Sequence, residues 1–394
     1  MGIRKLKENI FSVGVNHWDR RLFDELIPLP DGTSYNSYLI FGDKQTVLID
    51  TVDPAVKDEL FSNLSQFERF KIDFVISLHS EQDHSGSIPF VLEKFPEAKV
   101  ITNEKCKELL MEHLSIPQDK FVLVKDGETF DIGGKTLQFI FTPWVHWPET
   151  MSAYLKEDEI LFSCDFFGSH LAVSSLYEKN KSKLEESAKR YFAEIMAPFR
   201  SFIRANLKKL DGIEIKLIAP SHGPIHDEPK FIIDLYRNWS SDEVKNEVLL
   251  LYVSMHGSTK ILADALISSI IDKGITVHPF NMVNADLGEI AIRSVDAATI
   301  ILMTPTVLTG PHPVAAYYTI FLNAIKPKAM HFVVVTSYGW GGIAPDWIKS
   351  HMSNFKGEFL DPVQVKGLPK NLDILRMKEL AEKVLDKHKT LGIV

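Results

Sequence analysis

The chain has 394 residues, of which 45% are hydrophobic and 24% are charged, and its formal net charge is −8. This length is too great for one compact core, so we expect two domains. The acidic balance argues against nucleic-acid binding, which needs a basic surface.

Cysteine usage and hydropathy indicate a cytoplasmic protein. Cys106 and Cys164 are the two cysteines, and their wide separation excludes a disulfide framework and a cysteine-based zinc or iron–sulfur site. They fit a reducing compartment. The N-terminal stretch MGIRKLKENIFSVGVNHW has no apolar signal-peptide core. No apolar run reaches the roughly 18 to 20 residues that would span a bilayer.

The first part of the chain alternates short apolar runs with turns. Strands are predicted at 36–42 and 46–51, which form a hairpin around Asp43 and Lys44, and then at 74–78, 136–142, 159–165 and 215–223, the last running into a loop. A long, mostly helical stretch is predicted over 181–210, with Pro198 breaking or kinking it.

The pattern changes after the polar stretch 238–247. Four apolar runs are predicted strands, and between the first and second lies a predicted helix at about 259–273; the strands are 248–253, 276–280, 298–304 and 331–337. A continuous apolar run is typical of a parallel strand covered on both faces. Strands that alternate with helices predict a doubly wound parallel sheet. We therefore expect domains at 1–245 and 246–394.

Candidate metal ligands gather in the loops that follow predicted strands of the first domain. One loop, HSEQDH, carries four of them, and three further loops carry one each; the set is His79, Glu81, Asp83, His84, His146, Asp165 and His222. A single histidine such as His146 is more often a surface or core residue. The loop HSEQDH changes that expectation. Burying so many ionisable groups after a buried strand costs free energy, and metal ions bound by these groups would offset that cost. Seven groups suffice for two metals that share one carboxylate.

The HxExDH loop, a later histidine, an aspartate at a strand end and the late SHG resemble the metallo-β-lactamase superfamily. The resemblance implies an αββα sandwich with a two-metal site at one edge. Its zinc hydrolases usually carry a second histidine where this chain has Glu81. A hard, anionic oxygen ligand there favours iron, which changes oxidation state as zinc cannot.

The second domain contains loops that fit a flavin. The first follows the strand 248–253 and offers small and hydroxyl residues ahead of a helix, an arrangement that binds phosphate; it comprises Ser254, Met255, His256, Gly257, Ser258 and Thr259. It is neither GxGxxG nor a P-loop. It resembles the phosphate loop of flavodoxins, which bind FMN. The next two loops follow in the flavodoxin order and carry Pro305 and Thr306, then Ser337, Tyr338, Gly339, Trp340 and Gly341.

A metallo-β-lactamase-like domain followed by a flavodoxin-like domain resembles the flavodiiron proteins, also called A-type flavoproteins. The resemblance covers nearly the whole chain. It implies that one iron takes His79, Glu81 and His146, that the other takes Asp83, His84 and His222, and that Asp165 bridges them. It implies no catalytic residue beyond these ligands.

The same resemblance implies an oxidoreductase that passes electrons from FMN to the irons, where O2 is reduced to water or NO to N2O. It implies a head-to-tail homodimer or a dimer of dimers. The chain has no CxxC pair, so it carries no rubredoxin of its own. We expect a separate electron donor, a small rubredoxin, and no nucleic-acid or membrane partner.

Two alternatives stay open from the residues alone. One is a two-metal hydrolase with an attached flavodoxin-like module, which Glu81 and the flavin loops disfavour. The other is an electron carrier with a degenerate metal site, which the complete set of seven ligands disfavours. Metal analysis distinguishes the hydrolase, for which we expect two zinc ions and no iron. Assays of O2 and NO distinguish the electron carrier, which should consume neither gas.

Overall fold

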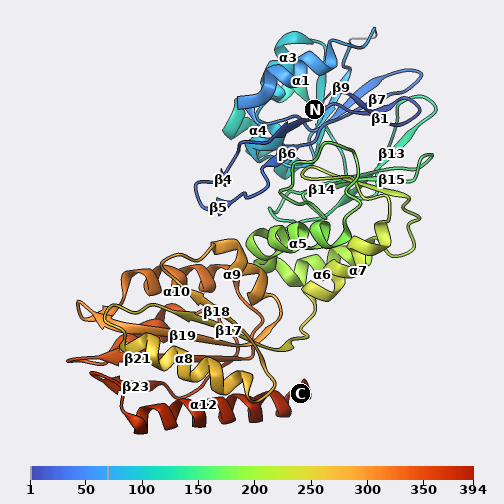
Figure 1. Cartoon of the computed structure of the whole chain (residues 1–394). Helices are drawn as coiled ribbons and strands as arrows, with labels where there is room; N and C mark the ends of the chain where they lie inside the picture. Colours follow the sequence, from blue (N-terminus) through green and yellow to red (C-terminus); the bar gives the residue numbers. More distant parts are fainter. Residues whose placement is uncertain (1, 69–70) are drawn as a thin grey trace. The chain divides into compact units, whose positions relative to one another are not determined.

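The computed structural model describes residues 2–68 and 71–394, and the chain divides into two units. The first unit comprises Met1–Phe192 and Phe199–Ser240, and the second comprises Ala193–Pro198 and Ser241–Val394 (Figure 1).

Two β-sheets form the centre of the first unit. The larger sheet has the order β1 (Arg4–Lys7), β2 (Ile10–Ser12), β7 (Tyr38–Phe41), β8 (Thr46–Ile49), β9 (Phe74–Ile76), β10 (Lys99–Thr102) and β11 (Phe121–Leu123). The smaller sheet has the order β12 (Thr129–Asp131), β13 (Thr136–Phe141), β14 (Met151–Leu155), β15 (Ile160–Cys164) and β16 (Leu217–Pro220). Two short antiparallel pairs join β3 (Val15–His17) to β6 (Thr33–Tyr35) and β4 (Leu22–Phe23) to β5 (Ile27–Pro28).

The two sheets share an apolar core, and the central strand β8 is buried on both of its faces. Successive side chains of a strand point to opposite faces. In β8, Val47 and Ile49 join a core shared with Phe139 and Phe162 of the smaller sheet. Leu48, between them, packs in a second core with the helices of the larger sheet. The apolar run therefore fits a buried strand of a layered fold.

Helices cover the outer faces of both sheets. On the larger sheet lie α1 (Lys57–Leu64), α3 (Ile88–Lys94) and α4 (Glu104–Leu114), with the 3-10 turns Pro54–Val56 and Gln118–Lys120 nearby. On the side of the smaller sheet lie α5 (Lys181–Tyr191), α6 (Arg200–Lys209) and α7 (Pro229–Ser240) (Figure 1). The predicted helix break is confirmed, because a π-helical turn (Phe192–Met196) and a 3-10 turn (Ala197–Phe199) separate α5 from α6 around Pro198.

The second unit is built on a parallel sheet. Its order is β18 (Thr276–Asn281), β17 (Lys245–Tyr252), β19 (Ala297–Val307), β21 (His331–Tyr338) and β22 (Glu358–Phe359); β23 (Val363–Lys366) also pairs with β21, and β20 (Gly310–Pro311) pairs antiparallel with β19. β17 is the first strand of this unit along the chain, and β18, the second, lies beside it at the edge of the sheet. This is the doubly wound strand order of flavodoxin-like folds. The four predicted strands of this half are confirmed.

Helices lie on both faces of this sheet (Figure 1). α8 (Ser258–Ile271) and α12 (Asn371–Thr390) share one core with the sheet, in which Leu262 and Leu380 meet Leu250 and Val333. α9 (Leu287–Ser294) and α10 (Pro313–Ile325) lie on the other face, and α11 (Ala344–His351) packs against α10. The parallel strands consequently end together at one edge, where the loops that follow them meet.

Among the described residues, no helix combines the length and the apolar character needed to cross a membrane.

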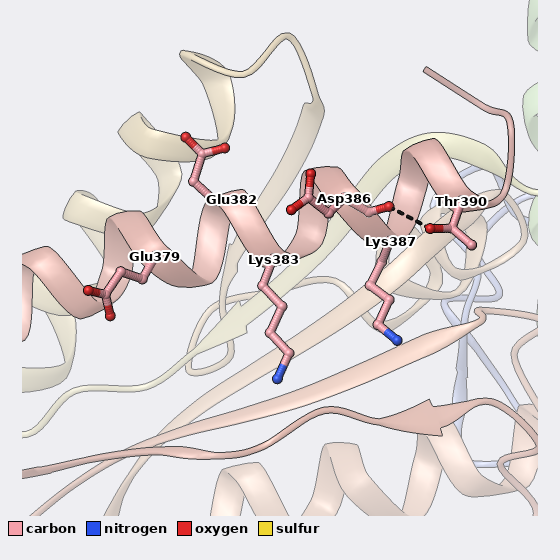
Figure 2. A pocket seen from close by; sticks show the side chains of 6 residues that line it. All are labelled: Glu379, Glu382, Lys383, Asp386, Lys387 and Thr390. Atoms are coloured by element: carbon pink, nitrogen blue, oxygen red, sulfur yellow. Dashed lines mark hydrogen bonds between the residues drawn. The ribbon is translucent and has the colours of Figure 1, made fainter.

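A pocket on α12 is lined by charged and polar side chains, among them Lys383 and Lys387 (Figure 2). These lysines pair with Asp361 at 2.8 Å and Glu358 at 2.6 Å, so we assign the pocket no ligand.

His388 of α12 makes the second unit sensitive to acid. Its ring is fully buried between Asn246 Oδ1 and Thr299 Oγ1, each 2.8 Å from a ring nitrogen. Burial, and then the nearby His331, lower the pKa of His388 to about 4. Below its usual pKa of about 6.5 the unfolded chain takes up a proton that the folded chain refuses. Stability is therefore complete above about pH 6.5 and falls as the pH drops towards 4.

We expect the free energy of unfolding to be about 1–2 kcal/mol lower at pH 5 than at pH 7 on account of this histidine. Urea unfolding at both pH values measures it. His388→Gln should reduce the difference, whereas His351→Gln, which changes an exposed histidine of α11, should leave it as in the wild type. An unchanged pH dependence in His388→Gln would contradict the expectation.

Candidate functional site

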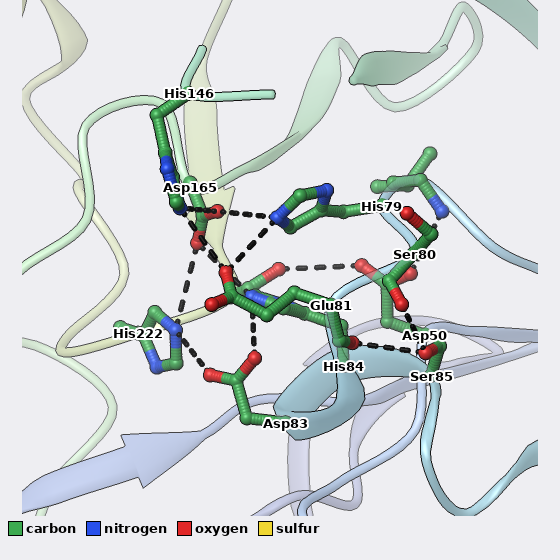
Figure 3. Close-up of polar contacts among 12 residues, drawn as sticks. Asp50, His79, Ser80, Glu81, Asp83, His84, Ser85, His146, Asp165 and His222 are labelled. Atoms are coloured by element: carbon green, nitrogen blue, oxygen red, sulfur yellow. Dashed lines mark hydrogen bonds and ion pairs between the residues drawn. The ribbon is translucent and has the colours of Figure 1, made fainter. Parts of the chain in front are cut away.

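The seven candidate metal ligands come together in the first unit (Figure 3). One loop after β9 carries four of them, two in its short helix α2 (Gln82–Ser85). His146 lies between β13 and β14, Asp165 directly follows β15, and His222 lies two residues after β16. Cys164 has a φ of +56°, a left-handed conformation in which the chain leaves the strand just before Asp165.

The first group consists of His79, Glu81, His146 and one oxygen of Asp165. Glu81 Oε2 lies 3.1 Å from Nε2 of both histidines. Asp165 Oδ2 lies 3.5 Å from His79 Nε2 and 3.6 Å from His146 Nε2. Atoms about 2.1 Å from one metal in tetrahedral geometry are about 3.4 Å apart, so this spacing suits one ion.

The second group consists of Asp83, His84, His222 and the other oxygen of Asp165. Asp165 Oδ1 lies 3.2 Å from His84 Nε2 and 3.5 Å from His222 Nε2. The Asp83 oxygens lie 3.3 Å and 3.1 Å from the same two nitrogens. Asp165 therefore gives one oxygen to each group, which is the arrangement of a bridging carboxylate.

Burial and missing hydrogen bonds indicate that these residues fit metal ions. Both oxygens of Asp83, both oxygens of Asp165 and His84 Nε2 are buried and have no hydrogen-bond partner. Unpaired buried polar atoms are costly, and metal coordination removes that cost. Burial would raise the pKa of Asp165, but His84 and the neighbouring histidine rings lower it well below its ordinary value. The set of imidazole nitrogens and carboxylate oxygens suits iron.

Hydrogen bonds orient two of the rings from behind. His79 Nδ1 lies 2.7 Å from Glu149 Oε1, and His222 Nδ1 lies 2.7 Å from the carbonyl oxygen of Ser34. Each bond directs Nε2 towards the ligand group, as in many metal sites. Burial would raise the pKa of Glu149, but His79 and Ser80 lower it to about 2, so its side chain is a carboxylate.

Three residues that contact the ligands or their neighbours were not predicted from the sequence: Glu149, Ser34 and Asp50. Glu149 follows His146 by three residues, and Asp50 ends a strand just as Asp165 does, so both had a signal. The Asp50 carboxylate accepts hydrogen bonds from the Leu78 N–H at 2.8 Å and from the Ser221 hydroxyl at 3.2 Å. Ser34 acts through its backbone, which no sequence pattern reveals.

A second site lies at the carboxyl ends of the parallel strands in the second unit. Its pocket is lined by Met255, His256, Ser258, Thr259, Pro305, Thr306, Ser337, Tyr338, Gly339 and Gly367. The loops after β17 and β19 flank the point where the strand order reverses, at which such folds bind ligands. Gly257, with a φ of +91°, precedes the first turn of α8, where backbone N–H groups attract phosphate.

Four of the thirteen predicted flavin contacts are absent from the pocket lining: Ser254, Gly257, Trp340 and Gly341. The Ser254 hydroxyl accepts a hydrogen bond from the Gly257 N–H at 3.2 Å and shapes the loop. Trp340 is 71% exposed, so its ring does not close the pocket in this structure. Gly367, after β23, lines the pocket and was not predicted.

Comparison with known proteins covers nearly the whole chain. A family described as "ODP family beta lactamase" matches residues 33–223. A nitric oxide reductase of Moorella thermoacetica is 31% identical, over 96% of this chain and 97% of its own length. A coenzyme F420H(2) oxidase of Methanothermobacter marburgensis is 33% identical, over 82% of each chain.

Solved structures agree. The rubredoxin oxygen:oxidoreductase of Desulfovibrio gigas matches with a TM-score of 0.95 at 27% identity, covering 98% of this chain and 99% of that one. The flavodiiron protein from Giardia intestinalis matches with a TM-score of 0.91 at 26% identity, covering 98% of both chains.

The first unit is of the β-lactamase type and has two groups of metal ligands, and the second is of the flavodoxin type. Together they define a class of proteins that combine a two-metal site with a flavin site. The chain belongs to the flavodiiron protein family. Both the resemblance and the fold class predicted from the sequence are confirmed.

Proposed function

We propose that this protein is an oxidoreductase that reduces O2 to water or NO to N2O at a di-iron centre supplied with electrons by FMN. The observation that carries the proposal is the division of Asp165 between two buried ligand groups, in a chain that also has a flavin pocket. One relative is named for nitric oxide and another for oxygen.

The ligand roles follow from the two groups. His79, Glu81 and His146 would hold one iron, Asp83, His84 and His222 would hold the other, and Asp165 would give one oxygen to each. When bound, iron and FMN would together store the electrons that the reaction needs, four for one O2 and two for each pair of NO molecules. The chain's residues hold the irons and orient His79 and His222.

FMN is assigned to the pocket in the second unit. Its phosphate would bind at the loop Ser254–Thr259 and the start of α8, and its ring would lie against the loops at Pro305–Thr306 and Ser337–Gly341. Thr259 and Ser337 support these loops through a 2.8 Å hydrogen bond between their hydroxyls.

We further propose a separate electron donor, a small rubredoxin, in line with the Desulfovibrio gigas relative's name. The Methanothermobacter relative is named instead for coenzyme F420H(2), so donor assays should include both.

The two cysteines, Cys106 and Cys164, are buried and free, which fits a protein of the reducing cytoplasm.

We also propose that the working unit is a head-to-tail homodimer or a dimer of dimers. Large apolar side chains are exposed at or near the flavin loops, which supports contact with another protein surface there; they are Met255 at 50%, Leu308 at 86%, Trp340 at 71% and Leu368 at 67%. Sedimentation of the active protein tests this proposal, and a fully active monomer would contradict it.

Anaerobic purification followed by metal and flavin analysis tests the main proposal. We expect two irons and one FMN for each chain, by the ligand groups and the pocket above. Reduced protein should then consume O2 or NO in side-by-side assays, which also ranks the two substrates. Two zinc ions without iron would favour the hydrolase alternative. Full cofactors with no consumption of either gas would favour an electron carrier.

A further inference from the structure

Glu149 is a buried carboxylate in contact with the metal centre but outside its ligand set. Its side chain has no exposed surface. Three donors converge on one oxygen, Oε1: His79 Nδ1 at 2.7 Å, the Ser80 N–H at 3.1 Å and the Ser80 hydroxyl at 2.6 Å. The other oxygen, Oε2, has no hydrogen-bond partner. A buried negative charge therefore lies directly behind the ring of one ligand.

The backbone around Glu149 is anchored as well. The Asn103 side-chain amide donates to the Glu149 carbonyl oxygen at 2.6 Å, and Asn103 Oδ1 also caps α4 by accepting from the Cys106 N–H at 3.1 Å. Glu149 follows His146 by three residues in the same loop. It is thus joined to His79 by a hydrogen bond and to His146 by the chain, and both rings belong to the first ligand group.

The second ligand group has a different support. His222 Nδ1 donates to a neutral acceptor, the Ser34 carbonyl oxygen, at 2.7 Å. Asp50 is the other buried carboxylate near this group, and one of its oxygens lies within 4.8 Å of a ring nitrogen of His84. The hydrogen bonds it accepts come from the Leu78 N–H and the Ser221 hydroxyl. The ring hydrogen bonds at His79 and His222 therefore differ by a full negative charge on the acceptor.

We propose that Glu149 is a positioning residue for the metal held by His79, Glu81 and His146, and that its charge makes this metal position unlike the other. It fixes the His79 tautomer with Nε2 facing the metal. A negative acceptor also makes the imidazole a stronger donor to the metal. The metal here is held more tightly and its oxidised state is favoured relative to a chain without this charge. This inference rests on the proposed di-iron function.

Two replacements separate the charge from the shape. Glu149→Gln keeps an oxygen at Oε1 that can accept the same three hydrogen bonds. It removes the charge and places an NH2 group where the buried second oxygen has no partner. Glu149→Ala removes the acceptor as well. Ser80→Ala is the matched control, because it removes one hydrogen bond to the same carboxylate and leaves the bond to His79 in place.

The test uses the full chain, loaded anaerobically with ⁵⁷Fe(II) and challenged with a chromogenic iron chelator. Losing an outer partner of a metal ligand typically costs about 10- to 100-fold in metal affinity. We expect one iron to be lost about 10-fold more readily in Glu149→Gln and about 100-fold more readily in Glu149→Ala. The second iron and the FMN should stay as in the wild type, and Mössbauer spectra should change for one iron only.

Ser80→Ala should weaken iron retention much less than Glu149→Gln does, because the charge of Glu149 and its hydrogen bond to His79 remain. Wild-type retention and spectra in Glu149→Gln would overturn the role of the charge, and equal weakening of both irons would overturn the selectivity. If Glu149→Ala does not fold, the comparison of Glu149→Gln with Ser80→Ala still shows whether the charge of Glu149 strengthens the binding of one iron. If the wild type binds two zinc ions instead, the proposed function fails, but the same competition with zinc still tests Glu149.

Discussion

Replacing Asp165 with alanine is expected to remove both irons and abolish O2 and NO reduction, while FMN stays bound. Each ligand group loses an oxygen, because Oδ2 belongs to the first group and Oδ1 to the second. The substitution also removes the negative charge of Asp165, which lies among the four histidine rings of the two groups. The loss of iron affinity should exceed the roughly 10- to 100-fold that removal of an outer partner costs. Iron and FMN content of the purified variant measure the effect.

Asp158→Ala is the control for this replacement. Asp158 lies near the opposite end of β15, where its carboxylate pairs with Lys135. Its removal should leave both irons in place. If Asp165→Ala retains one or both irons, Asp165 is not an obligatory bridge, and the assignment of its two oxygens is wrong.

Replacing Gly257 with glutamate is expected to abolish FMN binding and leave both irons in place. Gly257 has a φ of +91°, a conformation that costs a non-glycine residue of order 1–2 kcal/mol. The new carboxylate would also lie at the phosphate end of the pocket, where like charges repel by several kcal/mol. FMN affinity should therefore fall by at least about 100-fold, which corresponds to about 2.7 kcal/mol. Flavin fluorescence titration of the apoprotein measures it.

Gly274→Glu is a matched control. Gly274 also has a positive φ, +72°, and a Cβ there would meet no atom within 4 Å, as at Gly257. It lies just beyond the opposite end of α8, away from the phosphate loop. This variant introduces a similar strain and the same charge, and it should bind FMN as the wild type does. Equal loss of FMN in both variants would show that strain in α8, rather than repulsion at the phosphate, is responsible.

Local patterns sufficed for much of the fold and for one part of the site. Apolar runs such as 248–253 predicted parallel strands because burial on both faces leaves few polar residues in them. The loop His79–His84 stands out because four ligand types occur within six residues. His146, Asp165 and His222 were predicted by their places at strand ends and by the family resemblance. Six strands of the two sheets in the first unit were not predicted: β1, β2, β10, β11, β12 and β14. Most of them span three or four residues, which is too short for a clear alternation of apolar and polar positions.

The sequence by itself determined the residue types at the site, the order of the two units and the identity of the carboxylate, Glu81, that favours iron over zinc. Only the tertiary structure decided how the ligands divide, with one oxygen of Asp165 in each group. It also decided which groups support the rings: His79 meets Glu149 across 70 positions of chain, and His222 meets Ser34 across 188. The packing of strands distant in sequence selects such pairs. Glu149 lies close to His146 in the chain, but its position does not show that it faces His79. A backbone carbonyl looks alike at every residue, so no local pattern marks Ser34.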